Sequence, residues 1–512
     1  MKHAMMAASL AATAGVYEDR ERDWRNGAIV YQVIVDRFAP AADLDAKRAL
    51  YPAPKQLRAW SDEPTAGPLL PEFGLSAHEL HFWGGDLPSL TARLDHVQQL
   101  GAGVLYLTPI HLAWTNHKYD AFDNQAVSPE YGTRDDFRRL AAEARRRGLK
   151  VVVDGVFNHM GRRAPIFQQA LADPHSPWRD WFAIGPQYTG GARVWTGFQN
   201  HPELNLENPK VRQHLWEAPD SVVRSWLRDG ADGWRLDTAY ELGVPYLRAL
   251  TDAAHAEKPG SLVVGEIVNY PDRWLQGLDA VMNFSLRQVI AGLVDGELAP
   301  QAAARMTARL IQDAGIEPML KSWTVLDNHD IPRIATIWPD RAKRHLAQAL
   351  QFTLPGAPNV YYGAELGQVG GTDPANRGPM RWDLVGDANP ELAWMRRLIA
   401  LRQQHRALRV GDYRAVESDR LFAFERHTDR ALDTRIVVVN PHPTRVRERL
   451  MVANPDLMDD TPMVDVLGLA GELPPATFGP GFVLVELPPH SAVVLQPAPK
   501  ALGGYTRYKR VP

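Results

Sequence analysis

Three acidic residues follow apolar runs that have the length and composition of buried strands. Asp237 lies in GWRLDTA, Glu266 lies near the end of LVVGEI, and Asp330 ends VLDNHD. Two of these runs add a nitrogen-bearing side chain beside the acid, Arg235 and His329. Charged groups are rarely buried without a partner or a purpose. The pattern therefore indicates one acid-rich site built from strands that are far apart in the sequence.

A fourth apolar run, VVVDGVFNH, adds Asp154, Asn158 and His159. In a barrel of parallel strands, the carboxyl ends of the strands open onto one face, and catalytic residues come from several strands at that face. We expect the four runs to bring their polar side chains together there.

The elements needed to position such a site follow one another as repeated β–α units. Segments with helical periodicity separate the apolar runs, and Thr133, with Asp136 three residues on, is a plausible N-cap for one of these helices. Alternating strands and helices favour a parallel sheet. Eight units predict an α/β fold, a (β/α)8 TIM barrel. The expected strands lie within 28–38, 103–110, 151–159, 231–239, 261–267, 279–284, 323–330 and 358–365.

Changes in composition and in hydrophobic periodicity along the chain predict its domains. Two long insertions, 39–80 and 160–205, leave the first and third strands at their carboxyl ends, so both should overhang the mouth of the barrel. After about residue 405, short β-type runs separated by turns replace the helical patterns. We expect an N-terminal extension (1–24), the barrel (25–408), a small domain in the third βα loop (160–205), an antiparallel β domain (409–498) and a loosely attached basic tail (499–512).

Composition excludes several classes of function. The chain has 512 residues, a formal net charge of −3 and no cysteine. The charge gives no electrostatic footprint for nucleic acid, and the lack of cysteine excludes thiol catalysis and disulfides. No apolar run is long enough to span a membrane. Residues 1–15 are basic at the start but only weakly apolar for a signal peptide, so we expect a cytoplasmic protein, with the periplasm or secretion left open.

Several short motifs, in order, resemble those of the α-amylase family of glycoside hydrolases. The resemblance spans about residues 28–405. It implies a catalytic TIM barrel, a small domain in the third loop and a C-terminal β-sandwich. The motifs are HKYDAFDNQAVSPEYGTRDDF (117–137), DGVFNH (154–159), HPELNLENP (201–209), GWRLDTA (233–239), GEI (265–267), NHD (328–330) and GAPNVYYGAE (356–365).

The resemblance implies roles for the three acids. Asp237 resembles the nucleophile, Glu266 the general acid/base, and Asp330 the third carboxylate that holds sugar hydroxyls. Arg235 shares a strand face with Asp237 and is expected to keep that carboxylate ionised. Glu266 has no neighbouring cation in sequence, so we expect a raised pKa and a retained proton.

The resemblance also implies substrate contacts around these acids. Four of the expected contact residues also have a purely structural interpretation: His159 as a core histidine, Tyr119 as loop packing, and Asp373 with Arg377 as a structural ion pair. Asp154 resembles a residue that supports the site from behind. The expected substrate-binding residues are Tyr119, Asp120, His159, Arg235, His329, Asp373 and Arg377.

Neither a cofactor nor a metal is expected in the chemical step, although many family members carry a structural calcium. The resemblance makes Asn158 a candidate ligand for that ion. Tyr240 and Glu241 stand where calcium-binding members often have Lys-His, which argues against the site.

The subgroup signatures look closest to the cyclomaltodextrinase, neopullulanase and maltogenic amylase branch. That branch usually has an N-terminal β domain that builds a dimer. Here the first strand begins near residue 28, so we expect neither the dimer-built pocket nor its cyclodextrin preference, and no oligomeric state is indicated. The predicted activity is retaining hydrolysis of α-1,4-linked glucans, such as maltooligosaccharides. A transglycosylase or glucoside isomerase with the same intermediate, and a non-catalytic binding homologue, are the alternatives.

Overall fold

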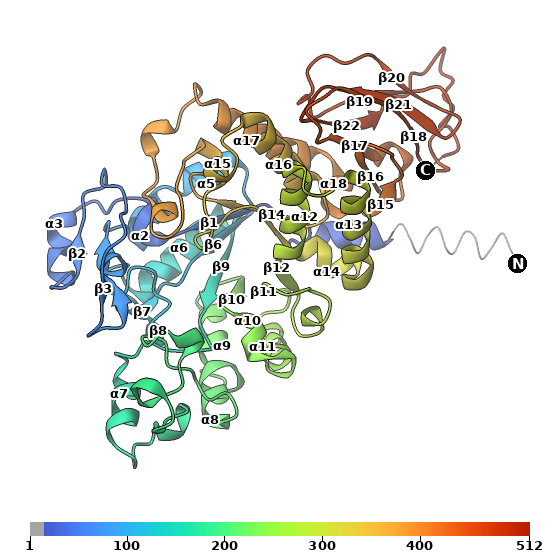
Figure 1. Ribbon diagram of the computed structural model, residues 1–512. Helices are drawn as coiled ribbons and strands as arrows, with labels where there is room; N and C mark the ends of the chain where they lie inside the picture. Colours follow the sequence, from blue (N-terminus) through green and yellow to red (C-terminus); the bar gives the residue numbers. More distant parts are fainter. Residues whose placement is uncertain (1–14, 512) are drawn as a thin grey trace, which may run out of the picture.

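The centre of the molecule is a closed barrel of eight parallel strands, as predicted. The computed structural model describes residues 15–511, and Figure 1 shows the barrel within a ring of helices. The strand order around the barrel is β1, β14, β13, β12, β11, β10, β9, β6. The strands are β1 (Val30–Val33), β6 (Val104–Leu107), β9 (Lys150–Gly155), β10 (Gly233–Leu236), β11 (Leu262–Ile267), β12 (Ala280–Asn283), β13 (Trp323–Val325) and β14 (Ala357–Tyr361).

Alternation along the strands divides the apolar residues between two cores. Val30 packs inside the barrel with Tyr106 and Trp323, whereas Tyr31 and Val33 pack outward. The outer core is covered by helices on the outside of the barrel. The larger ones are α5 (Leu94–Leu100), α6 (Arg134–Arg146), α9 (Val222–Arg228), α11 (Val244–Glu257), α12 (Phe284–Asp295), α13 (Pro300–Ala314), α16 (Arg341–Thr353) and α17 (Pro390–Gln404).

Local signals in the sequence explain where elements begin and end. Thr133 accepts a hydrogen bond from the backbone N–H of Asp136 and caps α6, as expected. The expected strand at 28–38 is shorter, because the chain turns into α2 (Val35–Phe38). The turn is fixed by Asp36, whose carboxylate accepts hydrogen bonds from the backbone N–H groups of Trp83 and Gly84.

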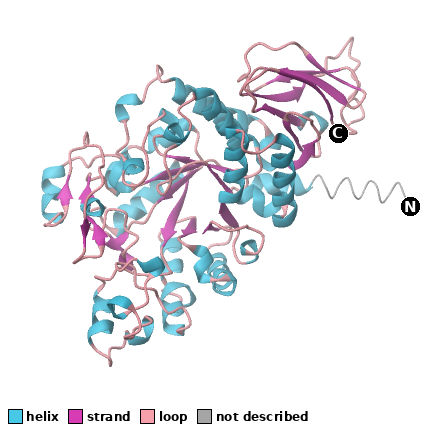
Figure 2. Cartoon of the chain, in the orientation of Figure 1, coloured by secondary structure: helices cyan, strands magenta, loops and turns pink. Residues whose placement is uncertain are grey.

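Three long loops at the carboxyl ends of the strands build the mouth of the barrel (Figure 2). The first contains the two short strands β3 (Leu69–Leu70) and β4 (Leu75–Ser76). The second is a hairpin of β7 (His111–Ala113) and β8 (Ala121–Val127). The third, 160–205, contains α7 (Pro165–Ala172) and short 3-10 turns.

The C-terminal domain is a continuous antiparallel sheet of eight strands, from β15 (Asp412–Val416) to β22 (Ser491–Pro497). Strands from both halves of the sheet contribute to one buried apolar cluster, so the two layers of the expected sandwich belong to one folded sheet. The predicted loose tail is instead attached, since the Tyr508 hydroxyl bonds to Thr461 and accepts from the N–H of Met458.

The described part of the N-terminal extension is also docked. Residues 15–22 form a helix, and Arg20 on this helix forms ion pairs with Glu317 at 2.7 Å and Asp412 at 2.9 Å. Residues 1–15, which were considered as a signal peptide, lie outside the described residues except for Gly15.

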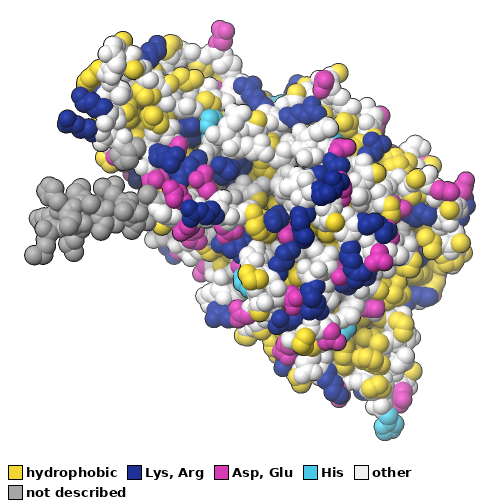
Figure 3. All heavy atoms as spheres, turned by 180° about the vertical axis from the view of Figure 1, so that it is seen from behind, with side chains coloured by type: hydrophobic (Ala, Val, Ile, Leu, Met, Phe, Trp, Pro, Cys, Tyr) yellow, Lys and Arg dark blue, Asp and Glu magenta, His cyan; other side chains and the backbone are white. Residues whose placement is uncertain are grey.

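The surface agrees with the small net charge. Acidic and basic side chains are intermingled on the face shown in Figure 3. No helix in the part of the chain that the structure describes is long and apolar enough to cross a membrane.

Candidate active site

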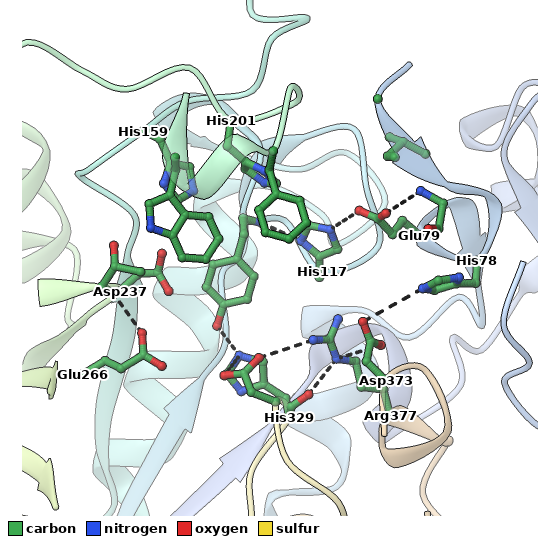
Figure 4. A pocket seen from close by; sticks show the side chains of 18 of the residues that line it. His78, Glu79, His117, His159, His201, Asp237, Glu266, His329, Asp373 and Arg377 are labelled. Atoms are coloured by element: carbon green, nitrogen blue, oxygen red, sulfur yellow. Dashed lines mark hydrogen bonds and ion pairs between the residues drawn. The ribbon is translucent and has the colours of Figure 1, made fainter. Parts of the chain in front are cut away.

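A cavity of about 530 Å³ opens at the carboxyl ends of the barrel strands. Its wall contains the three acids predicted from the sequence, together with most of the predicted binding residues (Figure 4). The predicted residues on the wall are Tyr119, His159, Asp237, Glu266, His329, Asp330, Asp373 and Arg377. Four others, Asp120, Asp154, Asn158 and Arg235, lie outside this lining.

Arg235 joins the acids beneath the cavity. Strand register places it beside Asp154 of β9 and Val264 of β11, and Glu266, two residues beyond Val264, faces the same side. The guanidinium is fully buried and lies 3.0 Å from Asp154, 3.1 Å from Asp237 and 2.9 Å from Glu266. Arg235 therefore organises the carboxylates from below and does not line the cavity, although it was predicted among the substrate-binding residues.

This geometry changes the predicted electrostatics. Glu266 does have a cation beside it, because the Arg235 side chain reaches across to the neighbouring strand. Burial raises the pKa of Asp237 well above its ordinary value, and the Arg235 guanidinium only partly opposes the rise. Burial likewise raises the pKa of Asp154. Asp154 and Asp237 therefore hold a proton more readily than an exposed aspartate does, and because both contact Arg235 their titrations are coupled.

A hydrogen-bonded chain fixes the two rings beside the nucleophile. The Gln32 amide donates to Nδ1 of His329, since its oxygen accepts from Asn359. His329 then carries its proton on Nε2, 2.6 Å from the Tyr119 hydroxyl, and that hydroxyl donates to Asp154 at 3.0 Å. Burial lowers the pKa of His329 well below its ordinary value, so the ring is neutral.

Tyr119 is held at the tip of the β7–β8 hairpin. The preceding residue, Lys118, has a φ of 65° and is buried beside Glu130 at 3.2 Å. The Tyr119 ring stacks on His329 with centroids 5.4 Å apart. Asp120, in contrast, turns away from the cavity: it is fully buried and accepts hydrogen bonds from Thr115 and Asn200. It supports the loop and does not contact the cavity, which corrects its predicted role.

His159 is a buried histidine whose ring faces the cavity. Only 1% of it is exposed, and neither ring nitrogen has a hydrogen-bond partner among the described residues. Burial lowers its pKa to about 3. A neutral ring with unused polar atoms at a cavity wall fits a residue that hydrogen-bonds a ligand, because buried polar groups are otherwise paired.

The remaining predicted residues form a network on the other side of the cavity. Arg377 donates to the backbone oxygen of His329 at 2.8 Å and to Asp330 at 3.4 Å. It also forms an ion pair with Asp373 at 3.3 Å. Asp373 and Arg377 are thus a structural pair and part of the cavity wall at once.

Thr238 follows the nucleophile in a left-handed conformation, with a φ of 41°. This is costly for a β-branched residue, and such strain gathers at functional sites. The conformation turns the Thr238 N–H toward Glu266, which accepts it at 2.9 Å.

The surroundings of Asn158 do not fit a calcium ion. Calcium requires six to eight oxygen ligands, but the Asn158 amide donates to Glu241 at 3.1 Å, and the Trp195 indole donates to the other oxygen of Glu241 at 3.1 Å. Within residues 15–511, no three acidic or histidine side chains gather as a metal site would need. Glu241 joins Asn158 and Trp195 to the chain after Asp237 through these two hydrogen bonds.

Among the histidine and acidic side chains of the lining, four were not singled out from the sequence: His78, Glu79, His117 and His201. His78 and Glu79 lie in the first insertion, which has no periodicity that would mark them. His117 begins the HKYD segment, two residues before Tyr119, and was overlooked beside it.

Comparisons with known proteins agree with this architecture. The profile of the α-amylase catalytic domain matches residues 32–389. Neopullulanase 2 from Thermoactinomyces vulgaris is 33% identical over 427 residues, which cover 79% of this chain and 68% of the relative. A cyclomaltodextrinase from a Bacillus species is 33% identical over 435 residues, covering 81% and 73%.

A solved structure extends the similarity to nearly the whole chain. The cyclic α-maltosyl-(1→6)-maltose hydrolase of Arthrobacter globiformis, in its ligand-free form, has a TM-score of 0.77 and 31% identity. The match covers 93% of this chain and 100% of that one. With a barrel and an acid-rich cavity of this form, the chain belongs to the α-amylase family of glycoside hydrolases, whose catalysis requires no cofactor, and it is similar to the cyclomaltodextrinases and neopullulanases.

Proposed function

We propose that the protein hydrolyses α-1,4-glucosidic bonds of maltooligosaccharides or related α-glucans with retention of anomeric configuration. The observation that carries the proposal is the pair of acids, Asp237 and Glu266, held by one guanidinium at the wall of a cavity of oligosaccharide size. A retaining pair needs carboxyl groups only about 5–5.5 Å apart, one ionised and one protonated.

In the first step, a carboxylate oxygen of Asp237 forms a bond to the anomeric carbon while the bond from that carbon to the glycosidic oxygen breaks. Glu266 gives its proton to the departing oxygen. The proposed step therefore requires an ionised Asp237 and a protonated Glu266 when substrate is bound, and Glu266 borders the cavity where that oxygen would lie.

In the second step, Glu266 takes a proton from water, and the water oxygen displaces Asp237 from the anomeric carbon. Asp330 and Arg377 border the same space and are suited to hold the hydroxyl groups of the retained sugar. His159 is suited to hydrogen-bond this sugar, because its ring nitrogens have no partner among the described residues. The His329 ring borders the same space, with its nitrogens bonded to Gln32 and Tyr119. A sugar hydroxyl in place of water would give transglycosylation through the same intermediate.

The test is to trap the intermediate. A fluorinated maltosyl fluoride slows breakdown of a covalent glycosyl-enzyme, and peptide mass spectrometry should find the sugar on Asp237. The Asp237→Asn variant should remain unlabelled and lose nearly all turnover, because an amide is a poor nucleophile, while its circular dichroism is unchanged. A label on another residue, or a product of inverted configuration, would reject the mechanism.

Product chromatography then separates hydrolysis from transfer. Maltose, maltotriose, cyclodextrin, starch and sucrose should be tested as substrates at low and high sugar concentration. Shortened maltooligosaccharides would support hydrolysis. Lengthened or isomerised products as the main outcome would favour the transfer alternatives.

A further inference from the structure

The first-loop insertion reaches over the cavity as a hairpin whose tip is held by the other two loops. The strands β3 and β4 form the hairpin, and Phe73 at its tip packs edge-on against Trp114, with ring centroids 4.9 Å apart. The Arg163 guanidinium of the third loop lies 4.2 Å from the centroid of the Trp114 ring. The hairpin therefore has a fixed place in the folded protein.

The hairpin also touches the third loop directly. A Cβ added to Gly74 would lie 3.1 Å from the Cβ of Gln199 and 3.6 Å from the backbone nitrogen of Asn200. Gly74 has a φ of 67°, a conformation that favours glycine and allows this close approach. Gly74, Leu75 and His201 all line the cavity, so the first and third loops meet over one side of it.

The side beneath this contact is polar and rigid. Glu79 accepts a hydrogen bond from the Ser76 N–H at 2.6 Å and contacts His117 at 3.0 Å. Although burial raises it, these two partners lower the pKa of Glu79 to about 2, so the carboxylate is charged. His78 and Asp373, 4.0 Å apart, complete this side, as Figure 4 shows.

The opposite side is exposed and mostly apolar. Val268, which is 55% exposed, and Tyr240 line the cavity on this side. Trp195 and Phe198 belong to the third loop and stack with centroids 5.6 Å apart, and Phe198 packs on His201 at 6.1 Å, near the contact with the hairpin. Apolar groups at an open mouth can contact the faces of sugars, whereas fixed charges at the other side suit hydroxyl groups.

The position of Glu266 gives the cavity a direction. The proposed acid must face the departing oxygen, so the leaving part of the substrate extends past Glu266 toward Val268 and Tyr240. The sugar retained on Asp237 extends the other way, toward Arg377, Asp373 and Glu79, where the hairpin meets the third loop (Figure 4).

We propose that the retained side of the cavity is a blind end, formed by the 69–76 hairpin on residues 199–201, so that the enzyme cleaves α-glucans a short, constant distance from their non-reducing ends. The inference rests on the proposed function. Glu79, oriented by His117, would accept hydrogen bonds from the hydroxyl groups of the terminal sugar. The cavity volume of about 530 Å³ lies within the range that encloses ligands of drug size, which suits a short oligosaccharide.

The test is the position of the first cut. Maltotetraose to maltoheptaose, each with a fluorescent label at the reducing end, should be sampled at less than a tenth of conversion. The blind end predicts one labelled product from each substrate, shortened by the same number of sugars in every case. Labelled products of many lengths at this stage would overturn it, even if the trapped intermediate confirms Asp237.

A shortened hairpin supplies the variant. Replacing Pro71–Gly74 by two glycines keeps the β3 and β4 pairs but removes the contact with Gln199. This variant should give several-fold more internal cuts, while its rate on a nitrophenyl maltoside, which occupies only the centre of the cavity, changes little. The matched control is Glu72→Ala, which changes an exposed tip residue outside the cavity lining and should keep the single product.

The shortened hairpin could fail to fold, so a point variant tests the same contact independently. Phe73→Ala removes the ring that packs against Trp114 and should also increase internal cuts. If both variants fold, by circular dichroism, and both keep the single labelled product, the hairpin does not form the blind end.

Discussion

At the scale of single residues, the reactivity of the site depends on how Glu266 exchanges its proton. A nitrophenolate departs with little protonation, whereas a sugar alkoxide needs a full proton. We expect Glu266→Gln to slow glycosylation by an aryl maltoside far less than it slows maltotriose cleavage. Pre-steady-state measurements of both substrates check this, and equal losses on both would count against the acid role.

Sequence alone identified the residues of this cluster but not their contacts. Asp237, Glu266 and Asp330 are recognisable because each follows an apolar run in a short motif. Arg235 was paired only with Asp237, since sequence distance does not show that a long side chain also reaches an acid on the next strand. Asp120 was misplaced because the chain reverses at Lys118, so that Tyr119 and Asp120 point to different sides.

Glu241 also acts at the residue scale, as a link between Asn158 and Trp195. Because donors already satisfy its oxygens, we expect dialysis against a strong chelator to leave activity and the melting temperature nearly unchanged. A bound ion at a hundredfold excess over its Kd would stabilise the fold by about 2.7 kcal/mol. A large fall in melting temperature that calcium restores would contradict this assignment.

At the scale of elements, the turn after β13 carries a buried acid that is not at the cavity. Asp327 is 2% exposed and accepts the backbone N–H of Ile334 at 2.8 Å. Burial raises its pKa to about 6, despite the opposing hydrogen bond and the charge of Arg333. The folded protein therefore binds this proton more tightly than the unfolded chain does.

The direction of the pH effect follows from that difference. Stability from Asp327 is fully present below the unfolded pKa of about 4 and is lost as the pH rises through about 6. Asp327→Asn keeps an oxygen acceptor but has no group that titrates. We expect its unfolding free energy, relative to that of the wild type, to increase by roughly 2–3 kcal/mol as the pH rises from 4 to 7. Denaturant titrations across this range check the prediction; a pH-independent difference would contradict it.

Helices and strands could be predicted where the hydrophobic pattern is strong. They could not be predicted where contacts with other loops determine the conformation. Each of the eight barrel strands falls on a predicted run, although β9 and β14 begin one residue earlier, since buried parallel strands are nearly continuous in apolar residues. The hairpin at 69–76 gave no such signal. Its strands are two residues each, and its position depends on Trp114 and Gln199, which belong to other loops.

At the scale of the whole molecule, the N-terminal helix connects the barrel to the C-terminal domain. Arg20 is 6% exposed and contacts Glu317 of the barrel domain, Asp412 of β15 and the backbone oxygen of Val410. We expect Arg20→Ala to lower the unfolding free energy by about 1–3 kcal/mol, because it removes charge-assisted hydrogen bonds.

The matched control lies on the same helix. The side chain of Arg22 is 72% exposed, and Arg22→Ala should change the unfolding free energy by less than about 0.5 kcal/mol. Equal effects of the two substitutions, measured by denaturant titration, would show that the helix does not connect the domains through Arg20.

The three acids gathered on Arg235 also have a consequence for inhibition. Their combined negative charge exceeds what one guanidinium can neutralise, so the empty cavity attracts a positive centre placed beside Asp237. A ring that develops positive charge during bond cleavage supplies such a centre only for an instant, whereas a protonated imino sugar supplies it permanently. Amine-bearing sugar mimics should therefore bind more tightly as the pH rises and the buried Asp237 and Asp154, whose pKa values are raised, become ionised, until the amine itself is deprotonated.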